Sequence, residues 1–155
     1  MAAEAIIELR SVSARSGSYE VLGELSFSVA EGESAVFMGA AGSGKSSLLK
    51  AAAGILIPAE GEVLYRGRPL SQFSRREELE FRKRSGFAFQ DAALWANQSI
   101  FDNLALPYRL HEPGATKSAV EAAVRRAAEL VGYGQDLLAR PSELSSGERK
   151  LIGLA

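Results

Sequence analysis

The sequence predicts an α/β fold, and three of its features support this prediction. Short segments near the N-terminus alternate apolar and polar residues, which is the pattern of half-buried strands. A glycine-rich loop, Gly39–Gly44, then separates a short apolar run from a segment rich in helix formers. In the second half, apolar residues recur at three- and four-residue spacing, as in helices with one buried face. We expect a mixed sheet around the helix that follows the loop, a small antiparallel part and a helical subdomain.

Strands are predicted along the first part of the chain. Ala5–Val12 is the first, and a polar turn follows it before the strands Tyr19–Leu22 and Leu25–Val29. The third of these alternates apolar residues with two serines, which gives it one apolar face. Ser34–Met38 is a short apolar run directly before the glycine-rich loop, and we expect it to be a buried strand that leads into the loop.

Helices dominate the prediction for the rest of the chain. The helix after the loop begins near Lys45 and ends before Gly54, and Pro58 prevents it from resuming. A strand is expected at Gly61–Tyr65 and a short one at Gly86–Phe89. The remaining elements are helical: Arg75–Arg84, Ser99–Leu106, Thr116–Val131 and a last helix that Ser145 or Ser146 caps and that runs to Ala155.

Composition and charge exclude several classes of function. The 155 residues are 46% hydrophobic and 24% charged, as is ordinary for a globular domain. A net charge of -1 gives no basic excess, so we expect no nucleic-acid partner. The absence of cysteine excludes disulfides and thiolate metal sites and is compatible with a cytoplasmic location. The longest apolar stretch, Ala51–Ala59, falls short of the roughly 20 residues that span a membrane. We therefore expect any membrane role to depend on a partner.

The loop and the start of its helix, Gly39-Ala-Ala-Gly-Ser-Gly-Lys45-Ser46, fit the pattern G-x-x-x-x-G-K-S/T without a mismatch. Small residues let the backbone N–H groups face phosphate oxygens, and the helix adds the positive end of its dipole. We expect Lys45 to contact the β and γ phosphates of ATP as a catalytic residue, and the Ser46 hydroxyl to ligate Mg²⁺. The alternative is a plain glycine-rich turn with an exposed lysine. The residues expected to bind the cofactor are Gly39, Ala40, Ala41, Gly42, Ser43, Gly44, Lys45, Ser46 and Ser47.

Three further segments narrow the class of protein that carries such a loop. Leu144-Ser-Ser-Gly-Glu148, about 100 residues after Lys45, resembles the signature of the ABC ATPase family, usually written LSGGQ. Gln90 lies where the family has its Q-loop glutamine, and Leu22–Glu33 is similar to the strand-turn-strand before the family's phosphate loop. The chain therefore resembles an ABC ATPase over essentially its whole length, which implies a P-loop NTPase fold of the ABC type.

The resemblance implies roles for the signature and for Gln90. The signature residues would begin a helix and reach the γ-phosphate of ATP held by a second copy of the subunit. Serine 146 and glutamate 148 replace a glycine and a glutamine of the usual pattern. Gln90 would be a second catalytic residue that binds Mg²⁺ or the attacking water, the alternative being a solvated residue at a strand end. The signature residues in question are Ser145, Ser146, Gly147 and Glu148.

The family also places an aromatic ring against adenine. By spacing from Leu22, the matching position is Ser16, which carries no ring. The nearest ring is that of Tyr19, which either stacks on adenine or packs within its strand.

The segment from Phe89 to Pro107, with the Tyr-Arg-Leu-His that follows it, resembles the ATPase of bacterial lipid transporters of the Mla/Mce type. In ABC transporters this region receives a helix of the membrane permease, so we expect a permease to dock near Gln90–Tyr108. Apolar side chains would form the dock, unless they belong to the core of the helical subdomain. They are Leu94, Trp95, Ile100, Phe101 and Tyr108.

The resemblance implies the ATP-binding subunit of an ABC transporter, peripheral on the inner face of the membrane through its permease, with lipid as the candidate substrate. We divide the domain into a nucleotide-binding core (1–89), a helical subdomain (90–144) and a signature helix (145–155). The family's domain continues into a strand ending in Asp-Glu and a switch histidine, and neither occurs in this sequence. We therefore expect this truncated domain to bind ATP without hydrolysing it.

Two alternatives to a transporter subunit remain at this point. One is a non-transport ABC ATPase that acts on DNA or ribosomes, although the sequence has no long heptad segment between loop and signature. The other is a non-catalytic nucleotide-binding fragment.

Overall fold

The computed structural model describes residues 5–155, apart from the side chain of Ser16, and divides at Gly86 into two compact units. The first unit contains the strands, and the second, from Phe87 on, is helical within the described residues. The elements of the first unit are β1 (Ala5–Ser16), β2 (Tyr19–Ala30), α1 (Lys45–Ala52), β3 (Glu60–Tyr65), β4 (Arg68–Pro69), the 3-10 turn η1 (Leu70–Gln72) and α2 (Arg75–Arg84).

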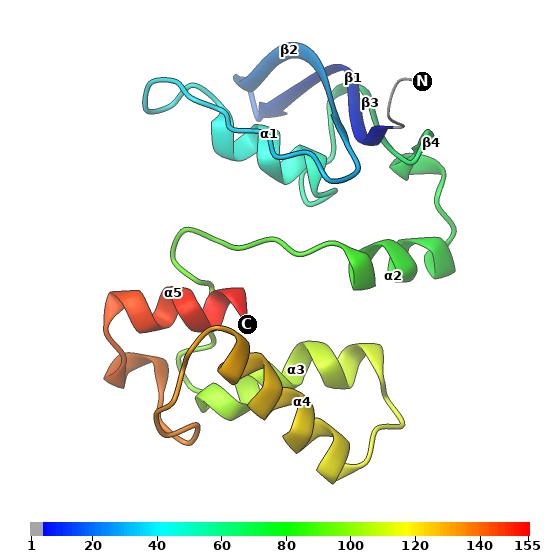
Figure 1. Ribbon diagram of the computed structural model, residues 1–155. Helices are drawn as coiled ribbons and strands as arrows, with labels where there is room; N and C mark the ends of the chain where they lie inside the picture. The colour runs from blue at the N-terminus through cyan, green and yellow to red at the C-terminus, as the bar shows by residue number, and fades with distance from the viewer. Residues whose placement is uncertain (1–4) are drawn as a thin grey trace. The chain divides into compact units, whose positions relative to one another are not determined.

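A four-stranded sheet in the order β2-β1-β3-β4 forms the frame of the first unit, and each neighbouring pair is antiparallel. β1 and β2 make a long curved hairpin (Figure 1) that turns at Gly17, where φ is +61°. The predicted polar turn at 13–18 is wrong for residues 13–16, and the predicted break between two short strands at 23–24 is also wrong. Both stretches stay in the ladder because β-bulges absorb their irregular register.

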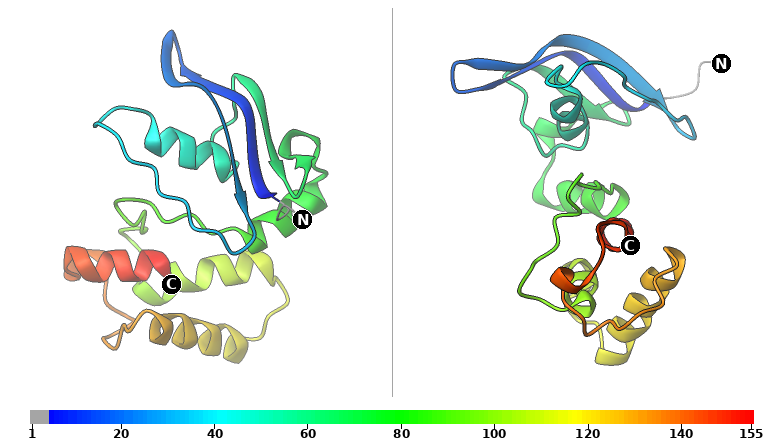
Figure 2. Two further views of the ribbon diagram at one scale, coloured as in Figure 1. Left: turned by 45° about the horizontal axis from the view of Figure 1, so that its top comes forward. Right: turned by 90° about the vertical axis from the view of Figure 1, so that its left-hand side faces the viewer.

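Helix α1 lies against one face of this hairpin (Figure 2), and the contact buries the core of the first unit. Leu48 and Ala51 face the sheet one turn apart on the helix, so a single apolar stripe fixes its orientation. The predicted helix at 45–53 is confirmed apart from its last residue. The buried core residues are Leu9, Val12, Ala14, Leu22, Leu48, Ala51 and Val63.

Two predicted strands do not form. Ser34–Met38 and Gly86–Phe89 are irregular and pair with no strand among the described residues. Val36 is 82% exposed and Met38 is 91% exposed, so the apolar run before the loop is not buried. The physical reason is that apolar strands are stabilised by cross-strand neighbours and burial, and neither is supplied here.

Helix α2 completes the first unit and is tied to the end of α1. Ser74 and Glu77 form a reciprocal capping box at its start. The Arg82 guanidinium donates two hydrogen bonds of 2.8 Å, to the carbonyl oxygens of Ala53 and Gly54. These carbonyls follow the last turn of α1, so the negative end of that helix meets a positive charge.

The second unit consists of α3 (Ile100–His111), α4 (Lys117–Leu130), the 3-10 turn η2 (Pro141–Glu143) and α5 (Ser146–Leu154). α3 and α4 pack against each other, and each starts at a capping hydroxyl, Ser99 or Thr116. The core gathers side chains from α3, α4, α5 and the segment between α4 and α5, namely Ile100, Ala128, Tyr133, Leu144 and Ile152. Among the described residues, no helix has the length and apolar character that a membrane span needs.

Candidate functional site

The glycine-rich loop curls back on itself before α1 begins. Gly42 and Gly44 have φ values of +79° and +87°, and the Ser43 N–H donates to the Ala40 carbonyl at 3.3 Å. Left-handed backbone of this kind is readily adopted by glycine and strained for residues with a Cβ. The two glycines therefore produce the turn that brings the residues of the loop around one point.

Gly44 also fixes where the loop sits on the sheet. A Cβ added at this position would lie 2.9 Å from the Val21 carbonyl oxygen and 3.3 Å from a methyl group of Leu22. The backbone of the loop thus approaches β2 more closely than any side chain would allow. Because β2 is paired with β1 along most of its length, the end of the loop is held against a fixed element of the sheet.

The ammonium group of Lys45 lies at the centre of the loop. Its Nζ donates to the Gly39 carbonyl at 2.9 Å, to the Ala40 carbonyl at 2.6 Å and to the Ser43 hydroxyl at 3.3 Å. The loop is therefore wrapped around one positive charge, and phosphate oxygens are the ligands that such a charge attracts. Lys45 is thus engaged by the loop, and its contact with phosphate stays a prediction.

The first turn of α1 has no side chain that would compete with an anion for its backbone N–H groups. Its N-cap, Gly44, provides no side-chain hydrogen bond, and no acidic residue lies in the first turn. The free N–H groups and the positive end of the helix dipole therefore point toward the loop without an internal carboxylate. Ser46 is exposed in this turn, so its hydroxyl is accessible to a metal ion carried by a phosphate ligand.

The predicted signature forms the start of α5, and Ser145 is its N-cap. The Ser145 hydroxyl accepts from the Glu148 N–H at 3.2 Å, and the Glu148 carboxylate accepts from the Ser145 N–H at 2.8 Å. Ser146 and Gly147 are exposed in the first turn. Of the two predicted caps, Ser145 is therefore the correct one, and glutamate at 148 has a structural role in the reciprocal box.

The carboxylate of Glu148 has a second partner residue that the sequence did not predict. Gln135, in the segment before η2, donates a side-chain hydrogen bond to it. The side chain and backbone of Ser145, together with Gln135, hold the pKa of Glu148 below its ordinary value. No spacing rule links residues 135 and 148, so only the folded second unit reveals this contact.

Gln90 is exposed at the start of a turn that contains left-handed backbone. Ala92 and Ala93, which follow Asp91, have φ values of +64° and +51°, and such values are unusual for alanine. Ala92 is buried against Gly153 of α5, where an added Cβ would lie 2.9 Å from the Ala92 Cβ. The segment after Gln90 is thus packed on the signature helix. Gln90 lies in the second unit and the loop in the first, so its role at Mg²⁺ stays a prediction.

The two residues considered for adenine lie at the turn of the hairpin. Ser16 pairs with Tyr19 across the turn, but the Ser16 side chain lies outside the described residues. Tyr19 is 78% exposed, so it does not pack into the core of the first unit. Its ring is therefore accessible for stacking, and contact with adenine stays a prediction.

The five apolar side chains considered for the permease dock divide into two groups. Ile100 is fully buried, and Leu94, Phe101 and Tyr108 pack against the two clusters of the helical core. For these four the core interpretation is confirmed. Trp95 is 59% exposed, and its backbone is held by Asn103, whose Oδ1 accepts from the Trp95 N–H at 2.7 Å. Only Trp95 of the five presents most of its side chain to a partner.

Comparison with known proteins extends these observations. The chain matches the ABC transporter family over residues 22–155. It is 35% identical over 150 residues to the intermembrane phospholipid transport system ATP-binding protein MlaF of Haemophilus influenzae, covering 97% of this chain and 56% of that protein. It is 35% identical over 149 residues to the probable ribonucleotide transport ATP-binding protein mkl of Mycobacterium leprae, covering 96% and 43%. The methionine import ATP-binding protein MetN of Chlamydia caviae is 32% identical over 151 residues, covering 97% and 44%.

Solved structures agree with this assignment of the fold. An ATP-binding cassette solved as a dimer in a post-hydrolysis state, bound to ADP and Pi, superposes with a TM-score of 0.81 at 23% identity, covering 96% of this chain and 67% of that one. CbiO1 of Clostridium perfringens, part of the ABC transporter complex CbiONQ, gives 0.76 at 22% identity, covering 97% and 60%. The chain spans about half the length of the curated relatives it matches. The predicted α/β fold class is confirmed, and the chain belongs to the ABC transporter family as part of its ATP-binding domain.

Proposed function

We propose that the chain binds ATP·Mg²⁺ as part of the ATP-binding subunit of an ABC transporter. The observation that carries the proposal is the loop closed around Lys45, which three oxygen atoms of the loop hold at its centre. A triphosphate would take over the Lys45 ammonium for its β and γ oxygens and accept from the N–H groups of Gly42–Ser47. Ser46 would ligate Mg²⁺, with Gln90 as a second ligand and Tyr19 against adenine.

A second copy of the subunit would complete each site. The exposed first turn of α5, with Ser146 and Gly147, supports contact with the γ-phosphate held by the partner copy. A similar ATP-binding cassette has been solved as a dimer with ADP and Pi, which supports the same arrangement here. Ser145 and Glu148 would separate to admit the phosphate, since they now exchange hydrogen bonds.

A membrane permease would be the second partner, and it would hold the subunit peripherally at the inner face of the membrane. Exposed Trp95, positioned by Asn103, is the side chain best placed to enter such a contact. Phospholipid is the first candidate substrate because residues 89–107 resemble the ATPase of Mla/Mce-type lipid transporters, and a phospholipid transport protein is among the relatives at 35% identity. Relatives with ribonucleotide and methionine in their names define the competing candidates.

Nucleotide binding by the 155-residue chain would not lead to turnover. The family's strand that ends in Asp-Glu does not occur among these 155 residues. Hydrolysis needs a carboxylate that polarises the attacking water. We therefore expect ATP to remain intact on this chain.

The test compares ATP·Mg²⁺ binding by calorimetry for the chain and its Lys45→Ala variant, with phosphate release followed in parallel. Loss of a charge-assisted contact weakens binding by about tenfold to a hundredfold. Lys117→Ala removes the same charge from the exposed start of α4 in the second unit and is the control, with no change expected. No binding by the parent chain, or equal effects of the two variants, would contradict the proposal. Phosphate release by the parent alone would refute the expected lack of turnover.

A further inference from the structure

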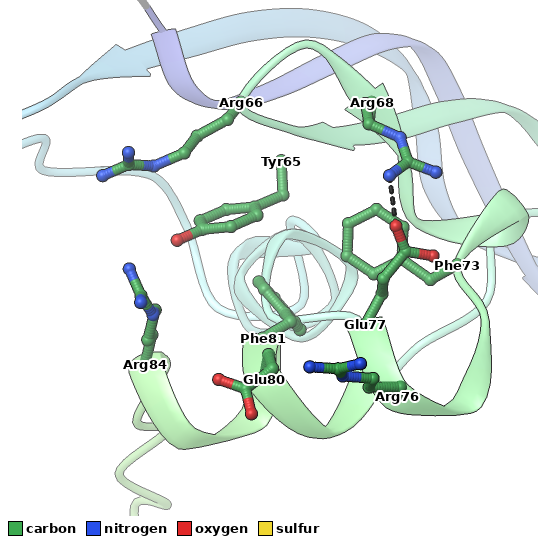
Figure 3. A pocket seen from close by; sticks show the side chains of 9 residues that line it. All are labelled: Tyr65, Arg66, Arg68, Phe73, Arg76, Glu77, Glu80, Phe81 and Arg84. Atoms are coloured by element: carbon green, nitrogen blue, oxygen red, sulfur yellow. Dashed lines mark hydrogen bonds and ion pairs between the residues drawn. The ribbon is translucent and has the colours of Figure 1, made fainter.

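A pocket separate from the phosphate loop lies in the first unit, between the β3–β4 turn and α2 (Figure 3). Its volume is about 360 Å³, which is within the range of small-molecule sites. Neither the phosphate loop nor any other residue assigned above to nucleotide contributes to its lining. The lining residues are Tyr65, Arg66, Arg68, Phe73, Arg76, Glu77, Glu80, Phe81 and Arg84.

The floor of this pocket is aromatic. The rings of Tyr65 and Phe81 meet edge to face with centroids 5.1 Å apart, and Phe73 meets Phe81 in the same way at 6.3 Å. Phe81 is buried, so these contacts tie the floor to the core beneath α2. A ligand in the pocket would therefore find a rigid apolar surface on one side.

The walls carry four arginines against two glutamates. Arg66 lies over the Tyr65 ring with its guanidinium carbon 5.8 Å from the centroid, and it also pairs with Glu31 at 3.2 Å. Arg68 lies over Phe73 at 5.6 Å and pairs with Glu77. These two guanidinium groups are thus oriented by the rings and by carboxylates.

The other two arginines have no such partners. No hydrogen bond or ion pair is described for Arg76 or Arg84 within residues 5–155, and Glu77 is already engaged by Arg68 and by the capping serine of α2. In Figure 3, Arg84, the hydroxyl end of Tyr65 and Arg66 lie at the same end of the pocket. Two cations and a hydroxyl donor therefore gather at one end, beside an apolar floor.

We propose that this pocket binds a phosphate ester, with the phosphate at Arg84, Arg66 and the Tyr65 hydroxyl and the organic part on the aromatic floor. Guanidinium groups bind phosphate in a bidentate manner, and Arg84 has its donors free to do so. Arg76 adds positive charge at the α2 wall, whereas the carboxylate of Glu80 opposes an anion. This inference is independent of the proposed function, because it uses no residue of the phosphate loop or the signature.

The experiment uses the full chain with Lys45→Ala, so that the phosphate loop contributes no competing site. Phenyl phosphate is the soluble probe, and nuclear magnetic resonance of the arginine side chains and of the Tyr65 ring follows the titration. Saturable shifts at Arg84 and Tyr65 are expected, with binding weaker by about tenfold or more in Arg84→Gln. Glu80→Gln should strengthen binding because it removes the opposing charge.

Arg75→Gln is the matched control, because Arg75 precedes Arg76 on α2 and does not line the pocket. Equal weakening by Arg75→Gln and Arg84→Gln would overturn the proposal, since general electrostatic attraction would then account for the binding. No saturable shift in any form of the chain would overturn it as well.

A second arm identifies the source of the phosphate ester. Phosphatidylcholine vesicles with and without phosphatidic acid are tested for co-sedimentation with the same variants. Arg84-dependent capture by phosphatidic acid would assign the pocket to a lipid phosphate. Binding of phenyl phosphate without vesicle capture would assign it to a free phosphate ester.

Discussion

Helices α1 and α5 both begin at predicted phosphate-contact segments, yet their first turns are built differently. α1 starts at a left-handed glycine that provides no side-chain cap, and its first turn has no acidic residue. α5 starts at Ser145, which exchanges hydrogen bonds with Glu148 in a capping box. The loop before α1 is closed by a lysine, whereas the start of α5 is closed by a glutamate.

The difference shows two ways to build a helix start. Its backbone N–H groups can stay available to an anion, or a side chain of the same helix can accept their hydrogen bonds. At α1 the unpaired N–H groups and Lys45 all favour negative charge, so the site needs a ligand to satisfy it. At α5 one carboxylate already lies beside the first turn, so an added phosphate must compete with it. We therefore expect a complete nucleotide site to depend more on α1 than on α5.

The largest expected effect that tests this comparison is on the stability of the phosphate loop. Gly44→Ala should lower the free energy of unfolding by about 2 to 3 kcal/mol, because it adds left-handed strain and a contact with the Val21 carbonyl. Gly42→Ala has the same strain with no atom within 4 Å of its Cβ, so about 1 kcal/mol is expected. Urea unfolding followed by circular dichroism measures both. Equal losses would show that the approach to β2 has no energetic role.

A smaller effect is expected at the capped helix. Ser145→Ala should destabilise the second unit by about 1 kcal/mol, since it removes the N-cap hydroxyl of α5. Ser146→Ala is the control, because Ser146 lies inside the first turn and should change stability little. Trp95 fluorescence during urea unfolding reports on the second unit. If both variants behaved alike, the assignment of Ser145 as the cap would be wrong.

The smallest effect concerns pH. The pKa of Glu148 is lowered in the folded chain by Ser145 and Gln135, so its charged form stabilises α5 above the ordinary carboxyl pKa of 4.5. This contribution is lost as pH falls through the lower folded value. Glu148→Gln keeps the box geometry and should remove this part of the acid sensitivity of the second unit. Thermal unfolding of the two forms at neutral and acidic pH, followed by Trp95 fluorescence, checks the expectation, and identical pH profiles would contradict it.

The sequence was sufficient where structure depends on neighbours in the chain. The helix after the loop and a serine cap before the last helix follow from patterns a few residues long. The strand predicted at Ser34–Met38 failed because burial of an apolar run depends on strands from elsewhere. The sequence also could not decide whether the five apolar side chains considered for the permease dock are exposed or belong to the core. Packing among α3, α4 and α5 shows that four of them contribute to the core, whereas Trp95 is mostly exposed.

In the candidate site, too, contacts between neighbours in the chain were predictable and contacts between distant residues were not. The motif predicted Lys45 as a phosphate ligand, but it could not predict that Gly39 and Ala40 hold the ammonium with their carbonyl oxygens. Gln135 contacts Glu148, and no helical or strand periodicity relates two residues at this separation in the sequence. The close approach of Gly44 to Val21 likewise requires the hairpin to be in place.

Arg82 contacts the end of α1 that lies opposite the phosphate loop. It binds the carbonyl oxygens just beyond the last turn of α1, and the helix axis puts about 12 Å between that turn and Lys45. The positive charge of Arg82 complements one end of the helix dipole, while bound phosphates would complement the other. For protein engineering, we therefore expect substitutions at Arg82, or at its ion-pair partner Glu78, to change the proposed nucleotide affinity in small steps without altering any proposed nucleotide contact.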